Sequence, residues 1–172
     1  MTNAFVFTPM DETSARAITG WRYQPPYDIY NLQPDEDVKE AIAYLVDPQI
    51  AFYTIRGRVG DLEQEELLAY CSFGQDAQVT GGDYGQEALD IGLGVRPDLT
   101  GQGHGLTFVA AVLDFARRHF NPIAFRVTIA AFNERAQRVW QKAGFRPTQT
   151  FRREYDGRPF VILIRGRRSV GA

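Results

Sequence analysis

The sequence of 172 residues has one cysteine, Cys71, and two histidines, His104 and His119. A single cysteine can form neither an intramolecular disulfide nor a cysteine-based zinc site. Neither histidine stands in a cluster of carboxylates at ligand spacing, so we expect no bound metal. No motif places a histidine beside Cys71. We therefore expect a buried structural thiol there and not a nucleophile.

Long apolar runs are also missing. None approaches the roughly 20 residues that span a bilayer, and the first residues lack the charged and then apolar pattern of a secretion signal. We therefore expect a cytoplasmic protein without a membrane partner. The formal net charge of −2 gives no broad electrostatic reason to expect nucleic acid as a partner. Apolar residues make up 44% of the chain, which is enough for a single domain over residues 1–172 with its own core.

Hydrophobic spacing predicts the elements. Runs rich in β-branched and aromatic residues predict strands, and apolar residues three and four apart predict helices. Pro25 and Pro26 exclude a regular helix from residues 21–30, and glycines predict a flexible surface loop over 75–86. The order of elements predicts a mixed α/β (α+β) sheet with a strand–helix–strand unit at its centre. Expected strands are 4–8, 50–55, 67–73, 88–95, 123–131, 148–155 and 160–165; expected helices follow residues 9–12 and cover 35–45, 106–120 and 133–143.

The most informative segment is 95–106, where a strand enters a loop with glycine at every second position and a helix follows at once. Gly101, Gly103 and Gly105 permit positive φ angles and let a ligand approach without meeting a Cβ. The N-terminus of the helix presents unpaired amide donors at the positive end of its dipole, which suits a pyrophosphate. The segment therefore predicts an anion-binding loop.

Two common phosphate-binding loops do not match it. A Walker loop ends in Gly-Lys-Ser/Thr, whereas Leu106 follows Gly105 here. The dinucleotide pattern G-x-G-x-x-G finds Leu106 or Phe108 where its last glycine belongs. Its ribose-binding acidic residue is missing as well, because residues 126–128 of the next expected strand read Arg-Val-Thr.

The segment instead resembles the signature Arg/Gln-x-x-Gly-x-Gly/Ala of the GNAT superfamily of N-acetyltransferases, with Gly103 and Gly105 at the two small positions. Thr100 stands where Arg or Gln is commonest. Residues 133–145 resemble a second motif of that superfamily, Asn-x-x-Ala-x-x-x-Tyr-x-x-x-Gly-Phe, with Trp140 in place of the tyrosine. The two motifs follow in order, separated by one helix and one strand. The resemblance implies a GNAT-like fold, a central mixed sheet of about seven strands flanked by about four helices.

The resemblance also implies a reaction: transfer of an acetyl group from acetyl-CoA to a primary amine of a small molecule, peptide or protein, by direct attack in a ternary complex. A homodimer is possible for such a protein. The backbone of Leu93, Gly94 and Val95 would bind the pantetheine arm of the cofactor, and Asn133 would reach the same arm. The pyrophosphate would be held by the amides of the glycine loop, namely Gly101, Gln102, Gly103, His104, Gly105 and Leu106.

The acid and the base of the reaction are less defined. Many members have tyrosine at the place of Trp140, where it protonates the leaving thiolate, and some have glutamate at the place of Thr128. Asp90 is the best remaining candidate for the general base, and the alternative is a strand-end carboxylate without a catalytic role. The departures at Trp140 and Thr128 leave a second hypothesis open, a CoA-binding sensor or interaction module without turnover.

Several of these residues also have an ordinary structural interpretation. Asn133 is a good helix N-cap, Gly144 is a good helix stop, and Trp140 suits packing. The four aromatic residues and Asp28 in the segment 21–30 suit a cationic amine, and they equally suit a proline-stiffened loop that closes the core.

Overall fold

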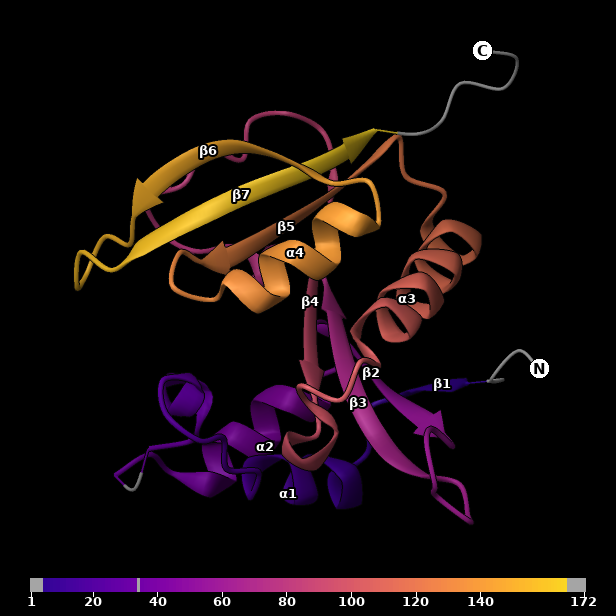
Figure 1. Ribbon diagram of the computed structural model, residues 1–172. Helices are drawn as coiled ribbons and strands as arrows, with labels where there is room; N and C mark the ends of the chain where they lie inside the picture. The colour runs from indigo at the N-terminus through magenta and orange to yellow at the C-terminus, as the bar shows by residue number, and fades with distance from the viewer. Residues whose placement is uncertain (1–4, 34, 167–172) are drawn as a thin grey trace, which may run out of the picture. The chain divides into compact units, whose positions relative to one another are not determined.

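The computed structural model describes residues 5–33 and 35–166 (Figure 1). Its contacts group into two compact units. The first contains the chain up to Ser72 together with Leu93–His104, and the second contains Phe73–Gly92 and the chain from Gly105 onward. Each unit is thus assembled from two separate segments. A single domain over residues 1–172 remains a prediction.

The strands form a seven-stranded sheet in the order β1-β2-β3-β4-β5-β7-β6. β4 pairs with β5 in parallel, whereas β1 with β2, β5 with β7 and β6 with β7 pair antiparallel. With the four α-helices of the described residues, this confirms the predicted mixed α/β class. The strands are β1 Val6–Pro9, β2 Ala51–Gly57, β3 Glu66–Phe73, β4 Leu89–Val95, β5 Ala124–Ala130, β6 Arg146–Arg152 and β7 Pro159–Gly166; the α-helices are α1 Glu12–Thr19, α2 Val38–Val46, α3 Gly105–Phe120 and α4 Glu134–Lys142; the 3₁₀ turns are η1 Tyr27–Tyr30, η2 Gln75–Ala77 and η3 Pro97–Leu99.

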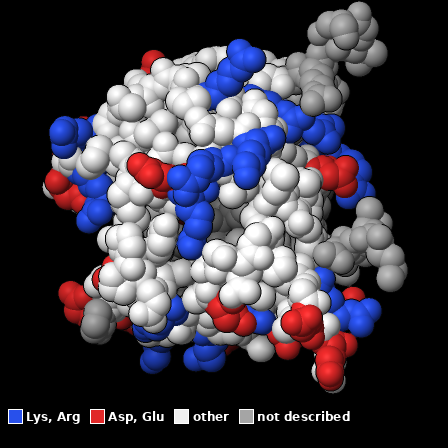
Figure 2. Space-filling view, viewed as in Figure 1, with Lys and Arg blue, Asp and Glu red and all other residues white. Residues whose placement is uncertain are grey.

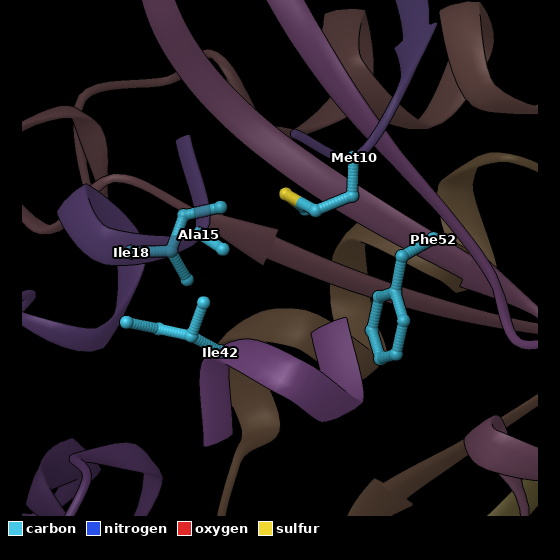
Figure 3. Packing of buried hydrophobic residues seen from close by; sticks show 5 residues of the cluster. All are labelled: Met10, Ala15, Ile18, Ile42 and Phe52. Carbon is cyan, nitrogen blue, oxygen red and sulfur yellow. The ribbon is translucent and has the colours of Figure 1, made fainter. Parts of the chain in front are cut away.

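The first unit has a small core of its own, formed where α1 and α2 meet β2 (Figure 3). Asp11 precedes helix α1 and caps it: its carboxylate accepts a hydrogen bond from the amide of Ser14 at 2.8 Å. One face of α1 then buries Ala15 and Ile18, three residues apart. Full burial of an aliphatic or aromatic side chain contributes about 1.5–3 kcal/mol. The buried members of this core are Met10, Ala15, Ile18, Ile42 and Phe52.

In the second unit, α3 presents a continuous apolar face, with five buried residues at helical spacing: Phe108, Val109, Val112, Leu113 and Ala116. Helix α4 is mostly polar, and Trp140 is its buried residue. It ends at Lys142 and is followed by Gly144, whose φ of +97° suits glycine. The guanidinium of Arg165 on β7 donates to the carbonyl of Ala143 at 2.9 Å and so satisfies a backbone group at this helix end.

The segment 74–88 includes the loop 75–86 that the glycines predict to be flexible, and hydrogen bonds fasten it to other parts of the second unit. The amide of Glu154 donates to the carbonyl of Thr80 at 3.0 Å, and the amide of Asp83 donates to Oε1 of Gln149 at 3.0 Å. The segment thereby covers β6, the last strand in the order of the sheet.

Candidate functional site

The hydrogen bonds of β4 decide which of its backbone groups can meet a ligand. The amide of Gly74 donates to the carbonyl of Asp90, and the amide of Arg96 donates to the carbonyl of Leu68, both at 2.9 Å. From the first bond to the second, the residue number rises from 90 to 96 on β4 and falls from 74 to 68 beside it, so β3 and β4 are antiparallel. Backbone groups of successive residues point to opposite edges of a strand. Asp90 and Arg96 face β3, and therefore Leu93 and Val95 direct their N–H and C=O groups to the other edge.

Gly94, which the resemblance includes with Leu93 and Val95, has a different part in this geometry. Its backbone groups belong to the edge that faces β3. A Cβ built at Gly94 would overlap the ring of Tyr70 on β3. Glycine is therefore required at this position because the aromatic ring lies directly against the backbone of β4.

Arg96 fixes the point where β4 leaves the sheet. Its guanidinium forms hydrogen bonds with both carboxylate oxygens of Asp98, an ion pair with Glu66 at 2.8 Å and a hydrogen bond with the carbonyl of Leu67 at 3.0 Å. The hydrogen bonds to Asp98 are the largest cause that raises the pKa of Arg96. The start of the glycine loop is thus held in place by charge-assisted bonds.

The glycine loop has the conformation that its sequence predicts. Gly101 and Gly103 have φ angles of +70° and +83°. A Cβ built at Gly103 would meet no protein atom within 4 Å, so open space adjoins this residue. The hydroxyl of Thr100 donates to the carbonyl of Pro97 at 2.7 Å and stays local. The loop therefore presents its backbone, without a side chain at Gly103, to whatever enters that space.

The loop leads directly into α3, a helix of 16 residues whose first turn contains no acidic side chain. Nothing in that turn neutralises the positive end of the helix dipole. Gly105 begins the helix for a packing reason, since a Cβ there would lie 3.1 Å from Cγ2 of Val139 on α4. Of the predicted loop residues, Gln102 and Leu106 are exposed, and His104 is half-buried with its ring near Gly60.

Asn133 caps α4. Its Oδ1 accepts a hydrogen bond from the amide of Ala136 at 3.1 Å, which is the ordinary structural role that the sequence offered. With Oδ1 used in the cap, the group of this side chain suited to a ligand carbonyl is the Nδ2 donor. A contact between Asn133 and a cofactor remains a prediction.

Asp90 is 4% exposed and lies in a buried polar network of the second unit. Its Oδ1 accepts from Nε of Arg126 at 2.6 Å, while its Oδ2 accepts from a terminal nitrogen of Arg126 and from Nε2 of Gln78, both at 2.8 Å. Another terminal nitrogen of Arg126 donates to the carbonyl of Gln86 at 2.7 Å, and the guanidinium lies 4.9 Å from the ring centre of Tyr84. The pair thus fastens the segment 74–88 at two points, Gln78 to Asp90 on β4 and Gln86 to Arg126 on β5.

Both oxygens of this carboxylate already accept hydrogen bonds, from Arg126 and from Gln78. The hydrogen bond to Asp90 also raises the pKa of Arg126, which stays charged. General-base catalysis by Asp90 remains a prediction, and the contacts describe a residue that positions the surrounding backbone. The sequence did not reveal this partner because Arg126 lies 36 residues away.

Thr128 belongs to the same network. Its hydroxyl lies 2.8 Å from the hydroxyl of Tyr84, which also accepts a hydrogen bond from the amide of Val79 at 2.9 Å. The sequence marked Thr128 only as a position where some relatives have glutamate. The structure adds Tyr84, a residue that no motif had indicated.

Trp140 and Cys71 are both buried. Trp140 is 6% exposed and packs edge-to-face against Phe145, with ring centres 5.0 Å apart. Cys71 is fully buried on β3, and burial raises the pKa of its thiol. A protonated thiol without solvent access is inert.

The described ranges, 5–33 and 35–166, contain no group of three or more His, Cys, Asp or Glu residues that could hold a metal ion. Within the same ranges no helix is long and apolar enough to cross a membrane.

Comparison with known proteins defines the class. A family model described as an acetyltransferase (GNAT) domain matches residues 6–146. Similar folds include an acetyltransferase of the GNAT family from Bacillus anthracis (TM-score 0.71, 11% identity, 96% of each chain) and a chimeric spermidine N-acetyltransferase from Vibrio cholerae and hSSAT (0.69, 14%, 93% of each chain). Another is yncA, a putative acetyltransferase from Salmonella typhimurium solved with its cofactor acetyl-CoA (0.63, 18%, 99% of this chain and 98% of the other).

A comparison with curated proteins finds no match. The fold and the matched domain are those of an acetyltransferase. The chain belongs to the GNAT family.

The Asp90–Arg126 pair generates a prediction on stability. Replacing one partner leaves the other charge buried and unpaired, which costs about 3–5 kcal/mol. We therefore expect Asp90→Ala and Arg126→Ala each to lower the free energy of unfolding by that amount, measured by urea denaturation. The double variant is expected to lose less than the sum of the two single variants, because the residues are in contact.

The matched control is Asp114→Ala, which removes an aspartate from the exposed pair with Arg118 on α3, with side chains 59% and 73% exposed. A loss below about 1 kcal/mol is expected there. Equal and small losses for Asp90→Ala and Asp114→Ala would show that the buried pair does not hold the unit together.

Proposed function

We propose that the protein transfers the acetyl group of acetyl-CoA to a primary amine by direct attack in a ternary complex. The observation that carries the proposal is the glycine loop, with positive φ angles at Gly101 and Gly103 and open space beside Gly103. Anions bind at such backbone concavities and at helix N-termini, and the pyrophosphate of the cofactor is such an anion. The family and the acetyl-CoA of the Salmonella typhimurium structure support the choice of cofactor.

The backbone groups of this chain suit the rest of the cofactor as well. The pantetheine arm carries amides, and Leu93 and Val95 direct N–H and C=O groups to the edge of β4 away from β3. We propose that these two residues bind the arm and that Gly94 supports them through its contact with Tyr70. The cofactor supplies an acetyl thioester. The acceptor amine gives up a proton and forms the new C–N bond as the C–S bond breaks and the thiol leaves. An N–H such as that of Val95 would stabilise the oxygen that becomes negative.

The distribution of charge favours an acceptor that is itself cationic. Residues 1–104 contain 17 Asp and Glu against 6 Lys and Arg, whereas residues 105–172 contain 4 against 13. Figure 2 shows Lys and Arg side chains gathered over α4, where Arg138 and Lys142 are exposed one turn apart. The basic part suits the phosphates of the cofactor and the acidic part suits a positively charged amine. One of the similar structures is a chimera of spermidine N-acetyltransferase.

The proposed function is tested by release of free CoA thiol from acetyl-CoA with a panel of amines: diamines and polyamines, amines with a neutral tail, and peptides with a free N-terminus. We expect turnover, fastest with amines that carry a second positive charge and weakened by salt. Acetyl-CoA should also raise the melting temperature, since a ligand of the folded state stabilises it, and NAD is the control. Stabilisation without turnover on any amine would favour a CoA-binding module.

Another prediction concerns the glycine loop. Gly103 and Gly157 both have positive φ, +83° and +72°, and a Cβ at either meets no protein atom within 4 Å. Alanine therefore imposes similar backbone strain at both, about 1–2 kcal/mol. Only Gly103→Ala places a methyl group in the proposed pyrophosphate site. We expect its acetyl-CoA affinity to fall tenfold or more, roughly 1.4 kcal/mol, by calorimetry. Gly157→Ala should bind acetyl-CoA as the wild type does. Equal acetyl-CoA affinity of the two variants would refute the proposed pyrophosphate site at the glycine loop.

A third prediction concerns Trp140, where many relatives have the tyrosine that protonates the thiolate. The buried indole packs on Phe145, so Trp140→Phe should lower the free energy of unfolding by about 1–3 kcal/mol. Turnover per folded molecule is expected to stay the same, because an indole is not an acid. A large loss of turnover in a stably folded Trp140→Phe variant would contradict the packing role.

A further inference from the structure

One polar contact within the first unit reaches the edge of β4 that we assign to the cofactor arm. The hydroxyl of Tyr23 donates a hydrogen bond of 2.7 Å to the carbonyl of Val95, 72 residues away in the chain. This is the carbonyl that points away from β3, as the bonds of Asp90 and Arg96 require. A carbonyl oxygen has two lone pairs and can accept a second hydrogen bond. Tyr23 is therefore bonded to a carbonyl that, under the proposed function, also accepts a hydrogen bond from the arm.

The hydroxyl of Tyr23 remains a donor over the whole physiological range. Burial raises the pKa of Tyr23 well above its ordinary value, and the neighbouring Tyr70 and Tyr30 act in the same direction. The ring of Tyr30 meets that of Tyr23 edge-on, with centres 6.4 Å apart. The bond to Val95 is thus partly buried and is not lost by ionisation.

Tyr23 also closes the loop in which it lies. Its amide donates to Oδ1 of Asn31 at 2.7 Å, and its carbonyl accepts from Nδ2 of Asn31 at 3.3 Å. Residues 23–31 therefore form a loop whose two ends are joined by the side chain of Asn31, and η1 lies within this loop. Tyr23 thus takes part in two contacts: its backbone closes the loop, and its hydroxyl is bonded to β4. Its hydroxyl therefore sets the distance between the loop and Val95.

Trp21, two residues before the loop, extends the contact. Trp21 lies against Tyr70, with ring centres 5.9 Å apart, and Tyr70 is the ring that Gly94 accommodates. Trp21 and Tyr70 both pack on the core of the first unit. Aromatic side chains thus lie beside residues 94 and 95: Tyr70 contacts Gly94, and the hydroxyl of Tyr23 is bonded to Val95.

From this geometry we infer that Tyr23 is a positioning residue of the transfer reaction: its hydroxyl holds the closed loop 23–31 at the edge of β4 where the cofactor arm binds, so that the loop forms part of the acceptor site. The inference rests on the proposed function. It assigns to Tyr23 an effect on the acceptor amine and not on the affinity for the cofactor, since the second lone pair of Val95 stays available to the arm.

Tyr23→Phe tests it, because the change removes the hydroxyl and keeps the ring. With the best amine of the panel, kcat/KM for the acceptor should fall about 3- to 10-fold, the effect of one lost hydrogen bond. Acetyl-CoA affinity, measured by calorimetry, should change less than twofold. Tyr155→Phe is the matched control: the same atom is deleted at a residue 76% exposed in the β6–β7 turn, and no constant should change.

Asn31→Leu provides an independent variant, since it removes the two side-chain hydrogen bonds that join the ends of the loop and leaves Tyr23 intact. We expect the same selective loss for the acceptor, together with faster hydrogen exchange of amides 23–31, and this variant decides the question if Tyr23→Phe does not fold. An unchanged acceptor kcat/KM in both variants would overturn the inference. Equal losses for acceptor and cofactor would overturn it too, because Tyr23 would then support β4 itself.

A gain in acetyl-CoA affinity in Tyr23→Phe would also overturn it, by showing that the hydroxyl competes with the arm for Val95. These outcomes are distinct from failure of the proposed function. A wild-type protein without turnover on any amine would overturn the function and the role of Tyr23 together, whereas an active wild type with an unchanged Tyr23→Phe variant overturns only the latter.

Discussion

The alternation of backbone direction along β4 is the constraint on which the proposed chemistry depends. Because Asp90 and Arg96 bond to β3, Leu93 and Val95 turn their backbone groups to the other edge. A shift of one residue in this register would turn those groups inward and place Gly94 at the ligand edge. The close contact of Tyr70 with Gly94 and the charged bonds of Arg96 to Asp98 and Glu66 fix the register in the first unit. The side chains around β4 therefore hold in place the backbone that we propose as the binding edge for the cofactor arm.

The second unit uses a buried charge for a comparable purpose. A buried ion pair is weak evidence for stability, since desolvation offsets much of the attraction. Asp90 and Arg126 are nevertheless fully satisfied: the carboxylate has partners in Arg126 and Gln78, and Arg126 also binds the carbonyl of Gln86. Such a network favours one arrangement of the segment 74–88, because another would cost Asp90 its bond from Gln78 and Arg126 its bond to the carbonyl of Gln86. That segment places the hydroxyl of Tyr84 within hydrogen-bonding distance of the hydroxyl of Thr128.

The sequence predicted the elements well wherever periodicity and turn chemistry agreed. Gly144 ends α4, and Asp156–Gly157 turns β6 into β7. Both effects are local and can be read from a few residues. The glycine loop was predictable for the same reason, since its φ angles depend on Gly101 and Gly103 themselves. The bonds between Tyr23 and Val95, and between Asp90 and Arg126, could not be predicted, because they join residues 72 and 36 positions apart and no periodic pattern marks either pair. Glycines alone suggested mobility over 75–86; the distant partners that fasten it were invisible.

The same distinction explains why the cofactor is better defined than the route of the proton. Backbone amides at Gly101–Leu106 need only a conformation, which glycine spacing encodes. A general base needs a free lone pair beside the amine, and Asp90 has given its oxygens to Arg126 and Gln78. A general acid is needed less, since a thiol with a pKa of about 8.5 leaves as thiolate without full protonation. A reaction with a good leaving group depends mostly on holding the amine at the thioester. For such a reaction, a residue such as Tyr23 that sets the position of a loop matters more than a residue that titrates.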